Sequence, residues 1–354
     1  MNAGGRRALA GAIVVLLLGP RGARAESLTG KPELLRVYDA IFDARFAEVP
    51  QLLGRTCPPA PAEACQLLDA VSVWWQIQLD PLSKAHDAQF HSKVDASIAA
   101  TEAWAKREPQ RAEAWFYVGG AYGARAQWRV LRGERLGAAR DGKRIKESLE
   151  RALALDPQPQ EAYFGIGLYH YYADVAPTAA KVLRWLLWLP GGDKVQGMRE
   201  MLRARESGAL LRDEADYQLH VIYLWYEKQP QRALDLLDGL RDRHPRNPLF
   251  LRLIAQVQDV YLHDHTASLR SWEALLDAAR ARRVEFAELA EVTAHLGMAQ
   301  QLDLLNDTNA AIEHLRAVIA MKPAAPYGAL EQAQRQLAHE FERARARQPS
   351  SGKR

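Results

Sequence analysis

Cysteine is scarce in this sequence, whose 354 residues include only Cys57 and Cys65. The two do not form a Cys-x-x-Cys pair, and no histidine stands at the spacing of a shared metal site, so redox and zinc motifs are not indicated. Because the two cysteines bracket a short proline-rich turn, they favour a local disulfide bond in an oxidising compartment. A redox or metal site is the alternative for this pair.

The motifs of catalysis are absent as well. The sequence has no nucleophile elbow, no His-Glu-x-x-His pair and no glycine-rich dinucleotide turn, and strand signals are missing throughout. The turn 191–194 lacks the full spacing of a phosphate-binding loop. His263 and His265 flank Asp264, which suggests a metal site, but polar residues are expected in a turn between two helices. We therefore predict no enzymatic activity, no cofactor and no metal.

Long apolar runs are missing too. The run Ala8–Leu18 has only eleven residues, whereas about 20 are needed to span a bilayer. It follows Arg6 and Arg7 and precedes the small residues Ala23 and Ala25, which is the pattern of a cleavable export signal. We predict a signal peptide over residues 1–25, cleavage after Ala25, and a periplasmic or secreted protein. An uncleaved anchor is the alternative.

The mature chain has no surplus of charge. The full sequence contains 47 Lys and Arg against 43 Asp and Glu, but residues 1–25 hold four arginines and no acid. Their removal leaves 43 of each sign. The basic isoelectric point is therefore no argument for binding nucleic acid, and we expect no nucleic-acid partner.

Apolar residues recur at helical spacing along most of the chain. Trp115, Val118, Gly119 and Tyr122 reproduce the W-x2-L-G-x2-Y opening of the tetratricopeptide repeat, with valine in place of leucine. In that motif glycine lets the partner helix approach closely. The chain thus resembles the tetratricopeptide-repeat family, which implies an all-α superhelix of helical hairpins.

The most regular repeat begins at Tyr217 and ends at Pro245. Its small residue, Ala233, follows the opening aromatic residue by sixteen positions, as in the repeat family. A shift by the family's 34 residues places Leu251 at the aromatic position and Ala267 at the small position. We predict that both alanines lie where the two helices of a hairpin touch.

Two repeats depart from this spacing. Trp115 and the next opening aromatic residue, Tyr163, are 48 residues apart, so we expect that an insertion around 129–143 lengthens both helices. A second insertion is expected before His295, near 276–286. The predicted organisation is one helical-repeat domain with inserted helices over residues 26–347 and a disordered tail over 348–354.

The central stretch carries a second resemblance. The order Gly165-Ile-Gly167, Ala176-Pro177, Val182–Leu186 and Gly191–Gly197 is similar to the inclusion-body-clearance and tetratricopeptide-39 family. Members of that family are helical repeat proteins without established enzymatic chemistry, and some are associated with mitochondrial membranes. The resemblance implies the same fold and a non-catalytic role.

A binding surface is predicted from aromatic residues. In tetratricopeptide arrays, the positions one and eight after the opening aromatic residue tend to face a concave groove. Here these positions and their neighbours supply six aromatic residues, namely Phe116, Phe164, Tyr171, Tyr172, Trp225 and Tyr226. Such rings are enriched at interface hot spots. In the alternative, the inserted segment Leu183–Leu189 covers them and they belong to the core.

Three functions fit these observations. The first is an exported scaffold that binds an unidentified protein or peptide without catalysis. The second is a membrane-associated scaffold, with Trp185 and Trp188 as peripheral anchors. The third is an enzyme or small-molecule binder whose pocket is closed by the insertions. The sequence favours the first.

Overall fold

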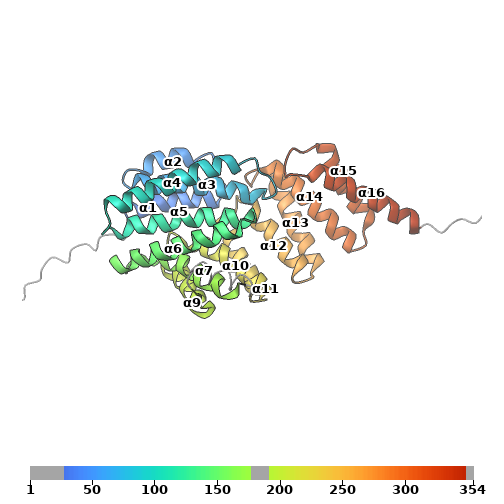
Figure 1. The fold of residues 1–354 in the computed structure, drawn as a ribbon. Coiled ribbons are helices and arrows are strands. Elements are labelled where there is room, and N and C mark those ends of the chain that lie inside the picture. Colours follow the sequence, from blue (N-terminus) through green and yellow to red (C-terminus); the bar gives the residue numbers. More distant parts are fainter. Residues whose placement is uncertain (1–27, 177–190, 348–354) are drawn as a thin grey trace, which may run out of the picture.

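The computed structural model describes residues 28–176 and 191–347, with side chains up to residue 342. The predicted signal peptide, the 183–189 segment with Trp185 and Trp188, and the predicted tail lie outside the described residues. Within the described ranges, every regular element is a helix (Figure 1). The predicted all-α class is therefore confirmed.

Consecutive helices pair as hairpins, and each hairpin packs on the next, as in a helical solenoid. The pairs are α1 (Lys31–Phe42) with α2 (Val49–Thr56), α3 (Ala62–Leu79) with α4 (Asp87–Arg107), α5 (Ala112–Leu131) with α6 (Arg135–Leu155), α7 (Ala162–Val175) with α9 (Lys194–Ser207), α10 (Arg212–Trp225) with α11 (Pro230–Arg243), α12 (Pro248–Val260) with α13 (His265–Arg280), and α14 (Ala287–Leu304) with α15 (Thr308–Met321), followed by α16 (Ala329–Arg347).

Glycine permits the close packing within two hairpins. A Cβ atom on Gly119 would lie 2.6 Å from the Leu149 side chain of the partner helix, which explains the glycine of the repeat motif. Gly167 of α7 and Gly197 of α9 face each other, and a Cβ on either would lie 2.6–2.7 Å from the carbonyl oxygen of the other. Asp193 caps α9, since its carboxylate accepts hydrogen bonds from two backbone N–H groups at 2.9 and 3.0 Å.

The insertion around 129–143 extends a hairpin, as predicted. α5 and α6 have 20 and 21 residues, whereas α10 and α11 have 14 each. Arg125 and Arg129 of α5 donate to the buried carboxylate of Asp141 in α6 at 2.8 and 2.7 Å. Arg125 and Arg129 thus hold the lengthened helices together.

The predicted repeat register holds at Ala233 but is wrong at Ala267. Ala233 is fully buried, whereas Ala267 is partly exposed and its neighbour Ser268 is fully buried. The spacing is therefore 35 residues rather than 34. Ser268 takes the place of the alanine because its hydroxyl donates to the Ala255 carbonyl oxygen at 2.9 Å, which satisfies the polar group.

Leucine substitutions distinguish the two registers. Ala233→Leu should overpack the contact between α10 and α11 and lower the free energy of unfolding by roughly 1–3 kcal/mol. Ala267→Leu adds the same side chain at a partly exposed site, so its effect should stay within about 0.5 kcal/mol. Thermal melting measures both. Equal destabilisation by the two variants would contradict the 35-residue register.

The first helices of successive hairpins gather around α3. The Trp75 ring contacts Phe42 of α1 and Tyr217 of α10, with ring centroids 4.3 and 4.8 Å apart. The Tyr217 hydroxyl donates to the Gln78 side chain at 2.8 Å. Arg252 of α12 donates to backbone carbonyl oxygens at the end of α3. Segments more than 130 residues apart in sequence therefore meet at one helix.

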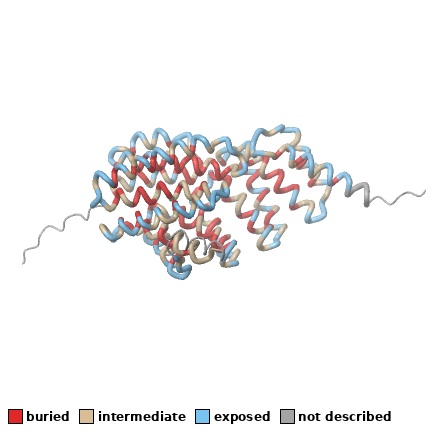
Figure 2. The backbone as a smooth tube through the Cα atoms, in the orientation of Figure 1, coloured by how far each residue is buried: buried red, intermediate tan, exposed pale blue. Residues whose placement is uncertain are grey.

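Two hydrogen bonds also join the turn after α1 to the turn before α12. The Asn247 side chain, at the start of α12, donates to the Phe42 carbonyl oxygen at 2.7 Å, and the Arg246 N–H donates to Asp43 at 2.9 Å. One core of buried residues consequently runs from Leu28 to Val257, and two smaller cores follow it. Figure 2 shows these buried positions on the helix sides that face one another.

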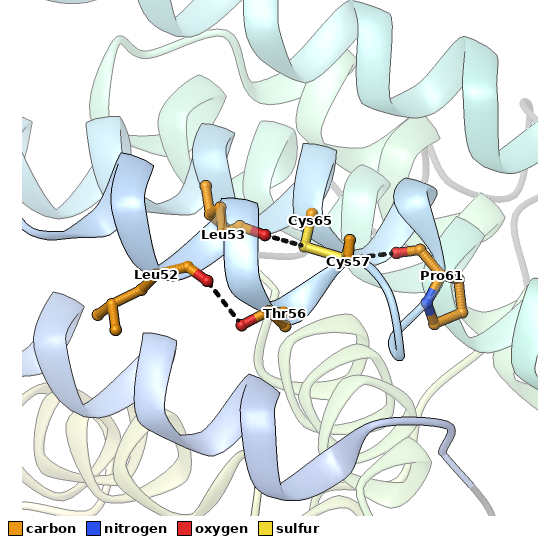
Figure 3. Close-up of a disulfide and its surroundings, with 6 residues drawn as sticks. All are labelled: Leu52, Leu53, Thr56, Cys57, Pro61 and Cys65. Carbon is orange, nitrogen blue, oxygen red and sulfur yellow. Dashed lines mark hydrogen bonds between the residues drawn. A yellow bond between two sulfur atoms is a disulfide. The ribbon is translucent and has the colours of Figure 1, made fainter.

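The predicted disulfide bond between Cys57 and Cys65 is present, with the two Cα atoms 6.3 Å apart (Figure 3). It joins the residue after α2 to the first turn of α3. The Thr56 hydroxyl beside it donates to the Leu52 carbonyl oxygen at 2.9 Å. The bond therefore ties the first hairpin to the helix at the centre of the fold.

Candidate partner-binding surface

The six predicted groove residues differ in burial, and Tyr172 is partly buried. Phe116 and Phe164 are buried, and Tyr171 is fully buried, so these three rings belong to the core. Trp225 and Tyr226, at the end of α10, have exposed fractions of 58% and 42%. Trp225 and Tyr226 are therefore the most exposed of the six predicted groove residues.

Tyr226 is fixed by two tyrosines of α7. The rings of Tyr171, Tyr172 and Tyr226 meet edge to face, with centroids 5.5–5.8 Å apart. The Tyr171 hydroxyl donates to the carboxylate of Glu227, and Lys194 lies 3.5 Å from that carboxylate. Burial raises the pKa of Tyr171 and Tyr172, so both hydroxyl groups stay protonated at neutral pH. The cluster holds Tyr226 in place.

Trp225 and Tyr226 are part of a wider pattern. Large apolar residues are exposed at the turns that follow the first helices of five hairpins. We call the large apolar residues exposed at these turns the turn edge; its members are Leu82 after α3, Val130 and Leu131 at the end of α5, Trp225 and Tyr226 at the end of α10, Val260 at the end of α12, and Leu304 and Leu305 at the end of α14. Helical periodicity does not reveal them, because each stands at or beyond the last turn of its helix.

The described residues offer little to support catalysis. Burial raises the pKa of Glu214 to about 7, which is a common property of general acids and bases. Its carboxylate, however, is buried between α10 and α5, where it accepts a hydrogen bond from Gln127 at 3.0 Å. The hollow lined by Leu79, Arg252 and Leu289 measures about 10 Å³, enough for little more than one water molecule.

The histidines serve packing contacts. His170 is mostly buried, and its Nδ1 atom lies 2.7 Å from the Glu200 carboxylate. His265 contacts Asp259 and Gln301 across α12, α13 and α14. No group of three or more metal-ligating side chains occurs in the part of the chain that the structure describes. None of the described helices has the length and apolar composition needed to cross a membrane.

Neither a family model nor a curated protein sequence matches the chain. Among solved structures, it is similar to a chain in the crystal structure of the APC/C hetero-tetramer Cut9–Hcn1, with 15% identity and a TM-score of 0.47 over 90% of this chain and 53% of that chain. This chain thus spans about half the length of that one. It is also similar to the human IFIT1 dimer with PPP-AAAA, with 13% identity and a TM-score of 0.35 over 90% of this chain and 86% of that one.

Similarities of this degree carry no argument about function. The assignment as a helical-repeat protein rests on the hairpins and contacts described above. The resemblance of residues 165–197 to the inclusion-body-clearance and tetratricopeptide-39 family remains an expectation.

Proposed function

We propose that this protein is an exported, non-catalytic helical-repeat scaffold that binds a protein or peptide partner through its turn edge. The observation that carries the proposal is the exposure of Trp225 and Tyr226 side by side at the end of α10. Aromatic side chains bury a large area at modest entropic cost when a partner covers them. The turn edge takes the place of the predicted groove because three of the six predicted groove rings, Phe116, Phe164 and Tyr171, are buried.

Other features support parts of the proposal. The basic, apolar and small residues of 1–25 are typical of a cleaved export signal. The Cys57–Cys65 disulfide suits an oxidising compartment such as the periplasm. The resemblance of the central stretch supports the non-catalytic role, since members of that family have no established enzymatic chemistry.

Replacing Trp225 with alanine tests the proposal. The variant should weaken binding of the partner that co-purifies with the chain by about 1–2 kcal/mol or more, as truncation of a hot spot does. Since the side chain is 58% exposed, the melting temperature should change little. The experiment uses protein recovered from the cell envelope, and its intact mass reports whether residues 1–25 have been removed.

Phe341→Ala is the matched control. Phe341 is an aromatic residue with an exposed fraction of 41%, and it lies on α16 rather than on the turn edge. Its replacement should leave both binding and melting unchanged. If Trp225→Ala lowers stability without a specific loss of binding, or if both variants bind alike, the turn edge around α10 is not the partner site.

A further inference from the structure

The last three helices have a small core of their own. Seven buried residues of α14, α15 and α16 form it, separate from the larger cores, namely Val292, Leu296, Ala299, Leu315, Val318, Ala329 and Ala333. Five of these contribute only alanine or valine side chains, so little apolar area holds the end of the array in place. Local opening needs the least free energy where the buried apolar contacts are fewest. Polar contacts can therefore control whether this end of the array opens.

A pair of histidines joins α14 to α15 beside this core. The Nδ1 atoms of His295 and His314 lie 2.7 Å apart, and their ring centroids are 4.9 Å apart. Arg280 of α13 approaches the other ring nitrogen of His295, with Nη2 3.3 Å from Nε2. His295 is buried.

These contacts define where the protons are. Arginine can only donate, so Nε2 of His295 accepts and carries no proton. The single proton of a neutral His295 is then on Nδ1, which donates to Nδ1 of His314. His314 must therefore be neutral as well, with its own proton on Nε2. A proton added to either acceptor nitrogen removes one of these hydrogen bonds.

The surrounding charges oppose protonation on balance. Burial, His314 and Arg280 lower the pKa of His295 to about 4, although Glu291, 3.9 Å from Nε2, acts in the opposite direction. Burial and Arg280 also lower the pKa of His314, against the smaller influence of Glu313 on α15 and Glu273 on α13. Glu291 itself is engaged by Arg280 at 3.1 Å.

We propose that His295 and His314 form an acid-sensitive latch, which holds α15 against α14 near neutral pH and releases α15 and α16 as the solution becomes acidic. The proposal concerns regulation and does not depend on the proposed partner. Release would separate the two helices that Leu304 and Leu305 connect, so it would also alter one end of the turn edge.

The direction of the pH effect follows from proton linkage. A histidine in the open form has an ordinary pKa of about 6.5, above its value in the closed form, so the open form binds protons more readily. The latch is therefore at full strength above about pH 6.5 and weakens as the pH falls toward about 4.

Hydrogen exchange of the backbone amides tests the latch on the intact chain. After correction for intrinsic exchange, the equilibrium constant for opening of α15 should increase at least about tenfold between about pH 7.5 and about pH 5.5. At the lower pH, the charged form of one free histidine outnumbers the neutral form about tenfold. Amides of α10 serve as the internal reference and should show no comparable change. An opening of α15 that is independent of pH would overturn the proposal, as would an equal increase in α10.

Glutamine variants identify the groups responsible. His295→Gln with His314→Gln removes both titrating rings and should abolish the pH dependence of α15 opening, and each single variant should reduce it. His339→Gln is the control, because His339 is on α16 with its side chain 64% exposed, and it should leave the dependence intact. If the double glutamine variant retains the full pH dependence of α15 opening, the latch is refuted.

Discussion

Trp75→Ala should lower the free energy of unfolding by about 3–5 kcal/mol, the range for loss of a large aromatic side chain from a packed core. Trp75 has no exposed surface and is among the largest fully buried side chains of the described chain. Its ring packs between Phe42 of α1 and Tyr217 of α10. The cavity would thus open where three helices meet, and neighbouring side chains could fill only part of it.

Denaturant unfolding of the purified chain measures this effect. Trp225→Ala is the matched control, because it removes the same side chain from a site that is 58% exposed. If Trp75→Ala and Trp225→Ala are equally stable, the closure of the array around α3 is wrong. A large loss confined to Trp75 would support it.

Patterns within one hairpin could be predicted from the sequence. Helical periodicity, the glycine of the Trp115 motif and the cap at Asp193 each depend on residues that are close in sequence or in the partner helix. The disulfide bond also follows from local spacing, because Cys57 and Cys65 are separated by one short turn. These features are the ones that the structure confirms.

Long-range closure could not be predicted in the same way. The repeat pattern does place Phe116, Phe164 and Tyr171 on the inner side of the array, but it does not show what occupies that side. The answer depends on contacts such as Tyr217 with Gln78, which are 139 residues apart. The sequence therefore left open whether these rings line a groove or belong to the core, and their burial assigns them to the core.

The wrong prediction at Ala267, by contrast, has a local cause. A 34-residue period is an average, and one additional residue before α12 moves every later position by one. The sequence offered Ala267 as the small residue, yet the buried position is occupied by Ser268, whose hydroxyl finds a backbone acceptor. Polar residues that satisfy their hydrogen bonds in a core do not stand out in an apolar pattern.

Removal of the Arg252 side chain is expected to have the second largest effect. Its guanidinium donates to the carbonyl oxygens of Leu79 and Gln78 at 2.6 and 2.7 Å, and so caps the C-terminal end of α3. The last carbonyl groups of a helix have no partner within the helix and carry partial negative charge. Arg252→Ala removes these charged donors and should lower the free energy of unfolding by roughly 2–4 kcal/mol, because two buried carbonyl oxygens lose their partners.

Two further variants separate the causes. Arg252→Met keeps most of the apolar stem but supplies no donor, so it should recover the packing and remain destabilised by about 2 kcal/mol, because two carbonyl oxygens stay unpaired. Arg270→Ala, at an exposed position on α13, is the control and should change stability by no more than about 0.5 kcal/mol. Full recovery by methionine would mean that Arg252 acts through packing alone. A deficit that persists in methionine would show that the carbonyl oxygens of α3 need a charged donor from α12, which is the contact that closes the array.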